Sequence, residues 1–434
     1  MKRRVIHLIS ILLVLAVVAG GVRLFARAMR NTESEAKYAD FLAHSDDVDV
    51  YFFGSSHMHY GVDPMQLWDD YGITSYNFGN GGLPLPLSYW SFRMAVERHQ
   101  PKVAVLDVFG LSKPDSDGMP VGLTHDAWDC FPLDRVKLEA IREVFPERSD
   151  RLELMFPFSV YHNRWDEVTL NDLLGEKEIR YNLLRGGERI HNVIPSQKMP
   201  QVADTEVYDI GHPTKALQYV ERFISDCKEL GIIPVLVYIP FEAQPERQME
   251  ANTIEQLAAS ENILYLNMLH QNVLDLETDS ADMNSHVNVS GMTKITAFLG
   301  KILSESGAAP DHRGDSAYAR WDADYAVYRE QEILERLKNT RSFDELLVQL
   351  YDDSLGAYIQ LFKGCGFDER EQLLLAQIPN MFGIEPDVEP EAGAPDADLR
   401  IIVYDTITGK EADIQYYNIR GVRVGEYNEP LYPE

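Results

Sequence analysis

Short apolar runs alternate with helical patterns along most of the chain between residues 48 and 305. The apolar runs are nearly continuous, and helix-length patterns separate them. Continuous apolar strands between helices are typical of a parallel sheet that helices cover on both faces. The sequence therefore predicts an α/β fold around a doubly wound open sheet. The expected strands are 48–53, 74–78, 101–109, 232–239 and 263–266.

Residues 111 to about 205 interrupt this alternation. They are rich in Pro, Asp, Arg and aromatic residues, which predicts a large insertion above the sheet. The helical pattern resumes after Pro213, where Leu217, Val220, Ile224 and Cys227 form an apolar stripe and Gly231 follows the helix end. The α/β domain is expected to span 48–305.

The C-terminal region has a different character, and 306–434 is expected to form a small α+β appendage. Residues 311–315 are a polar linker, 320–351 have a helical pattern, and 385–397 are rich in Pro, Ala and acidic residues. The segments 399–404 and 414–419 have the composition of strands.

The N-terminal sequence predicts where in the cell the protein is located. Lys2, Arg3 and Arg4 precede the run 5–22, eighteen residues without a formal charge at neutral pH. That run is long enough to cross a hydrocarbon layer of about 30 Å. The basic residues before it favour a cytoplasmic N-terminus and an extracytoplasmic body. We expect residues 1–30 to be a single-pass anchor in the cell membrane, or a cleaved signal peptide of a secreted protein, followed by a polar spacer over 31–47.

The acidic composition limits the partners. The 434-residue chain has a formal net charge of −29, so phosphates would be repelled and nucleic acid is not an expected partner. Cys130, Cys227 and Cys365 lie far apart, which indicates neither a disulfide framework nor a metal-type spacing. No cofactor is indicated.

Two short motifs contain candidate catalytic residues. Gly54-Ser55-Ser56-His57 directly follows the first strand, and Asp282 to Asn288 directly precedes a helical pattern. A Ser on a tight turn after a strand is exposed, and a His that follows an Asp can take its proton. Because ligands bind at the carboxyl ends of parallel strands, the motifs predict serine-dependent acyl transfer or hydrolysis. In the alternative reading, Gly-Ser-Ser is only a turn and His286 an ordinary histidine.

These motifs, with Asn77-Phe78-Gly79-Asn80-Gly81-Gly82, resemble the first, second and fifth sequence blocks of the SGNH (GDSL-like) hydrolases. The resemblance covers 48–305 apart from the insertion. It implies a flavodoxin-like three-layer fold, with Ser56 as nucleophile, His286 as base and Asp282 orienting the imidazole. The amides of Ser56 and Gly82 would stabilise the oxyanion.

The chain departs from the family pattern at two places. The third block normally carries Gly-x-Asn, whereas this chain has Gly110-Leu111-Ser112. The Asn oxyanion donor is therefore missing, unless Ser112 or a residue of the insertion replaces it. The Asp-to-His spacing is one residue longer than usual, so Asp279 is an alternative to Asp282.

The layout also resembles exported SGNH-like proteins associated with O-acetylation or D-alanylation of bacterial envelope polymers. This resemblance implies an envelope carbohydrate or acyl ester substrate, and a polytopic membrane acyltransferase as a partner. In the insertion, His162, Arg164 and Trp165 are candidates for binding a sugar, or else Arg164 forms a salt bridge and Trp165 packs under the loop. His57 and Asn288, beside the catalytic candidates, are further candidate substrate contacts.

Two other functions remain open. His57 and His59 would point the same way on an extended segment and bind zinc with Asp107 or His286, giving a metal-dependent hydrolase. Asp107 lies within an otherwise apolar stretch of strand and is either a hydrogen-bonded core acid or a site residue. The missing Gly-x-Asn motif would also be consistent with a catalytically inactive binding or scaffold protein that has the same fold.

Overall fold

The chain forms two compact units, Met1–Tyr318 and Ala319–Glu434. The computed structural model describes residues 2–28, 32–112, 118–157, 160–161, 168–169, 182–208, 214–282 and 286–338, and then 355–362, 369–370, 373, 376–377, 387–389, 399–405, 411–417 and 421–426.

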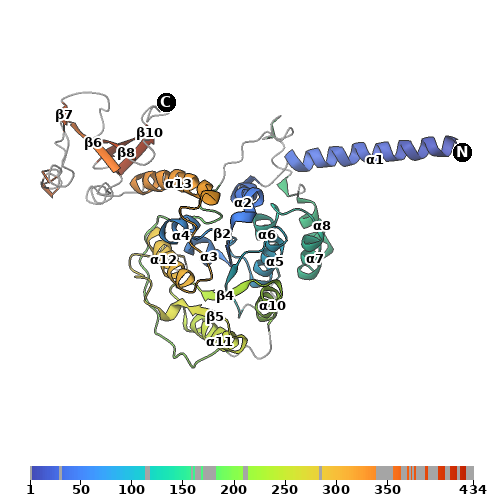
Figure 1. Ribbon diagram of the computed structural model, residues 1–434, viewed down its shortest axis with the longest axis horizontal. Helices are drawn as coiled ribbons and strands as arrows, with labels where there is room; N and C mark the ends of the chain where they lie inside the picture. The colour runs from blue at the N-terminus through green and yellow to red at the C-terminus, as the bar shows by residue number, and fades with distance from the viewer. Residues whose placement is uncertain are drawn as a thin grey trace. The chain divides into compact units, whose positions relative to one another are not determined.

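A parallel sheet forms the centre of the first unit (Figure 1). Its strands are β1 Val50–Phe53, β2 Ser75–Asn77, β3 Val103–Asp107, β4 Ile233–Tyr238 and β5 Leu264–Asn267. Within the described residues the order is β2-β1-β3-β4-β5, and every neighbouring pair is parallel. This is the strand order of flavodoxin-like folds. The predicted α/β fold with a parallel sheet is confirmed, and each expected strand overlaps an observed one.

Helices cover both faces of this sheet (Figure 1). The helices named here are α3 Ser56–Gly61, α4 Pro64–Tyr71, α5 Leu85–Val96, α10 Lys215–Leu230, α11 Pro245–Glu261 and α12 Val289–Glu305. Successive side chains of β1 point to opposite faces. Val50 and Phe52 belong to a core cluster that includes Ile295 of α12. On the other face, the Phe53 ring lies 5.6 Å from the Phe92 ring of α5. The result is three layers.

The segment 31–47 differs from the predicted spacer. The structure places helix α2 there, over Thr32–His44, after helix α1, Lys2–Ala28. Tyr38 and Phe41 are buried, and their rings lie 5.7 and 4.8 Å from the Phe78 ring beyond β2. The two aromatic residues are three apart and therefore share one helix face, which makes α2 part of the body.

Among the residues that the structure describes, we find no helix with the length and apolarity needed to cross a bilayer.

The predicted insertion contains helices α6 Val121–Trp128, α7 Arg135–Val144 and α8 Arg148–Met155. The last segment of the insertion that the structure describes begins at residue 182 and contains no helix or strand. We call residues 182–196 the strap. They hydrogen-bond to several loops of the body, as described below.

The second unit contains helix α13, Ala319–Lys338, and a sheet in the order β10-β9-β8-β6-β7 within the described residues. Its strands are β6 Leu355–Phe362, β7 Asp387–Glu389, β8 Leu399–Asp405, β9 Glu411–Tyr417 and β10 Gly421–Glu426. Strands β8 and β9 overlap the predicted segments 399–404 and 414–419. Helix α13 begins the predicted helical segment, of which residues 339–351 lie outside the described residues.

Candidate active site

Ser56 lies where the first strand turns into a helix. Strand β1 ends at Phe53, and Ser56 is the first residue of α3. Glycine is required at position 54, because an added Cβ would lie 2.8 Å from the Cβ of Asp107 and 3.0 Å from that of Met58. This close approach of the turn to β3 fixes Ser56 at the carboxyl end of the sheet, where open α/β folds bind ligands.

The structure brings Ser56, His286 and Asp282 together. The Ser56 Oγ lies 2.8 Å from His286 Nε2, and the His286 Nδ1 lies 2.5 Å from Asp282 Oδ2. The backbone N–H of His286 also donates to Asp282 Oδ1 at 3.2 Å. The carboxylate holds the ring proton on Nδ1, so the Nε2 lone pair faces the Ser56 hydroxyl. The arrangement can remove a proton from Ser56.

Asp279, the alternative carboxylate partner of His286, makes its hydrogen bonds to other residues. Its carboxylate accepts hydrogen bonds from Lys294 Nζ at 2.6 and 2.8 Å and from Ser290 Oγ at 2.8 Å. Asp279 therefore fastens its loop to helix α12, and Asp282 is the carboxylate that contacts His286.

Asn288 also holds this loop. Its side-chain amide donates to Thr278 O at 2.8 Å, while its side-chain oxygen accepts from Gly291 N at 3.2 Å and so caps α12. The residue is only 3% exposed. The candidate role of Asn288 as a substrate contact is therefore not supported, because its polar atoms are committed to positioning the loop.

The two predicted oxyanion donors lie on neighbouring turns. The turn after β2 is attached to the turn after β1, because Asn80 N donates to Gly54 O at 3.2 Å. Gly82 has φ +62°, a left-handed conformation that favours glycine. Within the described residues, neither the Ser56 amide nor the Gly82 amide donates a hydrogen bond to another group.

The polar groups of Ser112 contact two side chains of helix α11. Its backbone N–H donates to Glu250 Oε1 and its Oγ accepts from Arg247, both at 2.9 Å. Asn80 belongs to the Gly-rich motif, but the sequence assigns it no role in the reaction. Its environment differs from that of Ser112. Its Oδ1 accepts from Gly81 N at 2.9 Å, which identifies the other side-chain atom as the amide nitrogen. That Nδ2 is buried and has no hydrogen-bond partner in the described part of the chain.

The His-x-His pair does not have the expected geometry. His57 and His59 lie on helix α3, so they do not point the same way as they would on an extended segment. His59 Nε2 lies 3.1 Å from Glu188, and His57 packs against the Phe109 and Phe241 rings at 4.2 and 4.5 Å. The described residues include no cluster of three or more side chains suited to a metal ion.

Asp107 lies at the end of β3 and is 1% exposed. Its Oδ1 accepts from Ile239 N at 3.4 Å, whereas its Oδ2 has no hydrogen-bond partner within the described residues. Burial raises the pKa of the Asp107 carboxyl to about 7. Its position beneath the Gly54 turn fits a core acid that supports the site.

Aromatic rings border the imidazole of His286. The Tyr60 ring lies 5.2 Å from it and the His57 ring 6.1 Å from it. His57 is buried, so its predicted substrate contact would require access past Phe109 and Phe241. The other predicted substrate residues, His162, Arg164 and Trp165, lie outside the described residues.

No protein-family model matches the sequence, and no curated protein matches it. Several solved structures are similar to the chain at low identity, among them the following three. A putative lipolytic protein of the G-D-S-L family from Desulfitobacterium hafniense is 12% identical with a TM-score of 0.30, covering 59% of this chain and 100% of its own. A putative acylhydrolase from Bacteroides fragilis is 10% identical with a TM-score of 0.31, covering 62% and 95%. A GDSL-like lipase from Bacteroides thetaiotaomicron is 11% identical with a TM-score of 0.31, covering 64% and 100%.

Proposed function

We propose that this protein is a serine-dependent acyl esterase or O-acyltransferase that forms an acyl-serine intermediate. The observation that carries the proposal is the continuous hydrogen-bonded series from Ser56 Oγ through His286 to Asp282. A hydroxyl, an imidazole and a carboxylate in this order activate a serine nucleophile on unrelated folds.

In the first half of the reaction, His286 Nε2 takes the proton of Ser56 Oγ as that oxygen attacks an ester carbonyl carbon. The C–O bond to the leaving alcohol then breaks, and the imidazolium returns its proton to the leaving oxygen. Asp282 stabilises the imidazolium and keeps its proton on Nδ1. In the second half, water or another hydroxyl gives its proton to His286 Nε2 and attacks the acyl carbon. The bond between that carbon and Ser56 Oγ then breaks, and the imidazolium returns its proton to Ser56 Oγ.

Two backbone amides support the tetrahedral intermediates of both halves. The N–H groups of Ser56 and Gly82 are without acceptors among the described residues and come from turns that are hydrogen-bonded to each other. A preorganised donor of this kind typically contributes about 2.7–4 kcal/mol to lowering the barrier. The Asn80 amide, buried and without an acceptor in that part of the chain, is a candidate third donor in place of the missing Gly-x-Asn.

Envelope carbohydrate is the substrate class that we propose on the strength of the sequence resemblance. The Tyr60 and Phe109 rings near the site would suit the apolar face of a sugar ring. The membrane anchor, the extracytoplasmic location and a polytopic acyltransferase partner stay predictions from the sequence.

The proposal is tested with a fluorophosphonate probe and an activated acetyl ester on the purified protein. We expect labelling and turnover in the wild type, loss of both in Ser56→Ala and His286→Ala, and no effect of a chelator. Turnover that a chelator abolishes would favour the metal-dependent hydrolase. A folded wild-type protein that neither reacts with the probe nor turns over the ester would favour the inactive scaffold.

A further inference from the structure

One lysine contacts both segments that carry the backbone oxyanion donors. Lys37 of helix α2 donates from Nζ to Gly79 O at 2.6 Å, and the same Nζ lies 3.2 Å from His59 Nδ1. Gly79 starts the turn that ends at Gly82, and His59 lies on α3 three residues after Ser56. A single amino group therefore links the two turns whose amides are the proposed oxyanion donors.

The protonation of His59 supports this link. Burial lowers the pKa of His59 to about 4, so the ring carries one proton at neutral pH. Glu188 Oε2 lies 3.1 Å from Nε2, and a carboxylate favours the proton on that nitrogen. Nδ1 then has a lone pair that accepts from Lys37. The other tautomer would donate from Nδ1 to Gly186 O at 3.1 Å, but its Nε2 lone pair would face the carboxylate and Lys37 would lose an acceptor.

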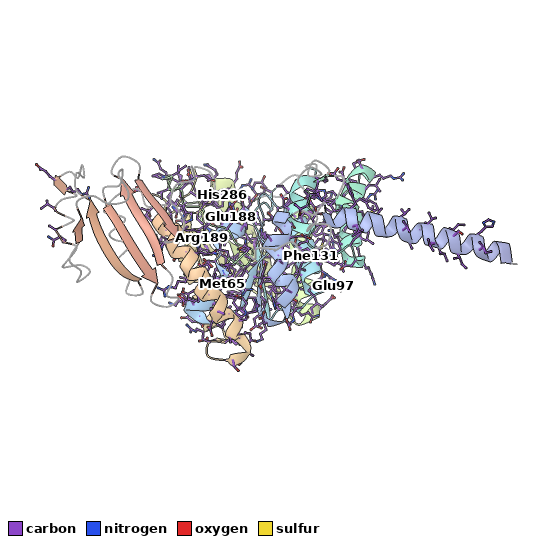
Figure 2. The ribbon with its side chains drawn as sticks, turned by 90° about the horizontal axis from the view of Figure 1, so that it is seen from above. Met65, Glu97, Phe131, Glu188, Arg189 and His286 are labelled. Carbon is purple, nitrogen blue, oxygen red and sulfur yellow. The ribbon has the colours of Figure 1, made fainter. Side chains whose placement is uncertain are left out.

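The strap connects this arrangement to the loop of His286. Glu188 N donates to His59 O at 3.2 Å, while Ile190 O accepts from Val289 N at 2.9 Å at the start of α12. Figure 2 labels Glu188, Arg189 and His286, which lie in the same part of the body. The groups around Lys37 thus contact the nucleophile segment, the donor turn and, through the strap, the segment that carries the base.

We propose that Lys37 is a positioning residue for the oxyanion site: through Gly79 O and His59 it sets the spacing between the Ser56 turn and the Gly79–Gly82 turn. This inference rests on the proposed function. It adds a residue that lies before the segment resembling SGNH hydrolases. A displacement of about 1 Å in a catalytic group can cost about 100-fold in rate, so a contact that fixes two donor-bearing turns has kinetic consequences.

The chain offers a matched control. Lys137 on α7 is a second buried lysine, whose Nζ donates to Trp128 O at 2.6 Å and Phe131 O at 3.1 Å. Burial lowers the pKa of both lysines. Both lysines therefore place an amino group against backbone carbonyls, but Trp128 and Phe131, which accept from Lys137, belong to the insertion and not to the two turns. The comparison separates a general effect on stability from an effect on the site.

The experiment compares Lys37→Met, Lys37→Arg and Lys137→Met in the full chain, using an activated acetyl ester and Ser56→Ala as the blank. We expect Lys37→Met to lower kcat by about 10- to 100-fold with KM within about threefold of the wild type. Lys37→Arg, which keeps donors for both acceptors, should recover at least part of the loss. Lys137→Met should lower Tm and leave kcat within about twofold. A wild-type kcat in Lys37→Met, or an equal loss in Lys137→Met, would overturn the inference.

Two further outcomes are decisive. If Lys37→Met does not fold, Glu188→Ala gives the same test, because the Glu188 side chain is 62% exposed and its removal should cost little stability. A severalfold lower kcat at unchanged Tm supports the inference, and an unchanged kcat contradicts it. A wild type without Ser56-dependent turnover would remove the proposed function and this inference together, whereas an active wild type with an unaffected Lys37→Met removes only the inference.

Discussion

Two histidine–aspartate pairs in the first unit share a spacing of four residues but differ in their surroundings. His286 Nδ1 lies 2.5 Å from Asp282, and His125 Nδ1 lies 2.9 Å from Asp129; each pair is four residues apart. In the first pair the side chains are 26% and 35% exposed, and in the second 2% and 4%. The imidazole Nε2 meets the Ser56 hydroxyl in the first pair. In the second it lies 3.7 Å from Glu153 Oε1 and makes no hydrogen bond within the described residues.

The difference shows that the pair alone does not make a reactive site. His125 and Asp129 lie one helical turn apart at the end of α6, so helix geometry alone brings them together. Asp129 also accepts from Tyr161 OH at 3.0 Å, and the pair fastens α6 within the insertion. His286 instead meets a hydroxyl that is 230 residues away in the sequence, and that contact depends on the whole sheet.

Replacing the carboxylate in each pair should give the largest contrast. Asp282→Asn keeps the size of the side chain but no longer favours the proton on Nδ1, so we expect kcat to fall by about 10²- to 10⁴-fold. Asp129→Asn should leave kcat within about twofold and lower the free energy of unfolding by about 1–3 kcal/mol, because buried hydrogen bonds are weakened. Steady-state kinetics and thermal unfolding measure both effects. A similar loss of kcat in both variants would contradict the distinction between the pairs.

The contact between Ser56 and His286 was predictable from the sequence, but much of the structure that supports it was not. Ser56 and His286 were found because a Gly-Ser-Ser turn followed an apolar strand and an Asp-to-His segment preceded a helix. Lys37 was missed because the two core aromatics of α2 stand among charged and polar residues, which suggested a spacer. The geometry expected for the metal alternative is not observed, because α3 begins at Ser56 itself and the His57 and His59 side chains follow a helical period. Such contacts depend on tertiary packing, which motif spacing does not specify.

The second contrast concerns the donors that accompany the reactive pair. Asn80→Asp keeps the oxygen that accepts from Gly81 N and removes the amide donor. If Asn80 serves the oxyanion, kcat should fall by about 100-fold with little change in KM. Ser112→Ala is the matched control, because Ser112 is hydrogen-bonded to Arg247 and Glu250. The kcat of this variant should stay within about threefold of the wild-type value. A greater loss in Ser112→Ala than in Asn80→Asp would reverse the assignment of the third donor.

The smallest effect should come from Asp107, a buried carboxyl beneath the Ser56 turn that has no imidazole partner among the described residues. Burial raises its pKa in the folded state to about 7, above the ordinary value of 3.8. Between these two values the folded state binds more protons than the unfolded state, so stability falls as pH rises. The contribution of Asp107 is fully present below pH 3.8 and is lost as pH rises through about 7.

Asp107→Asn removes this titration and leaves a neutral side chain that still accepts from Ile239 N. The Tm of the variant should match the wild type near pH 4 and exceed it by roughly 2–5 °C at pH 8, as thermal unfolding across this range would measure. The His125–Asp129 pair, which keeps its carboxylate beside an imidazole, supplies the control: Asp129→Asn should lower Tm at both pH values. If Asp107→Asn instead lowers Tm equally at pH 4 and pH 8, Asp107 is ionised throughout and a cation or additional donors must face its Oδ2. The turn that carries Ser56 would then be supported by a charge rather than by a neutral acid.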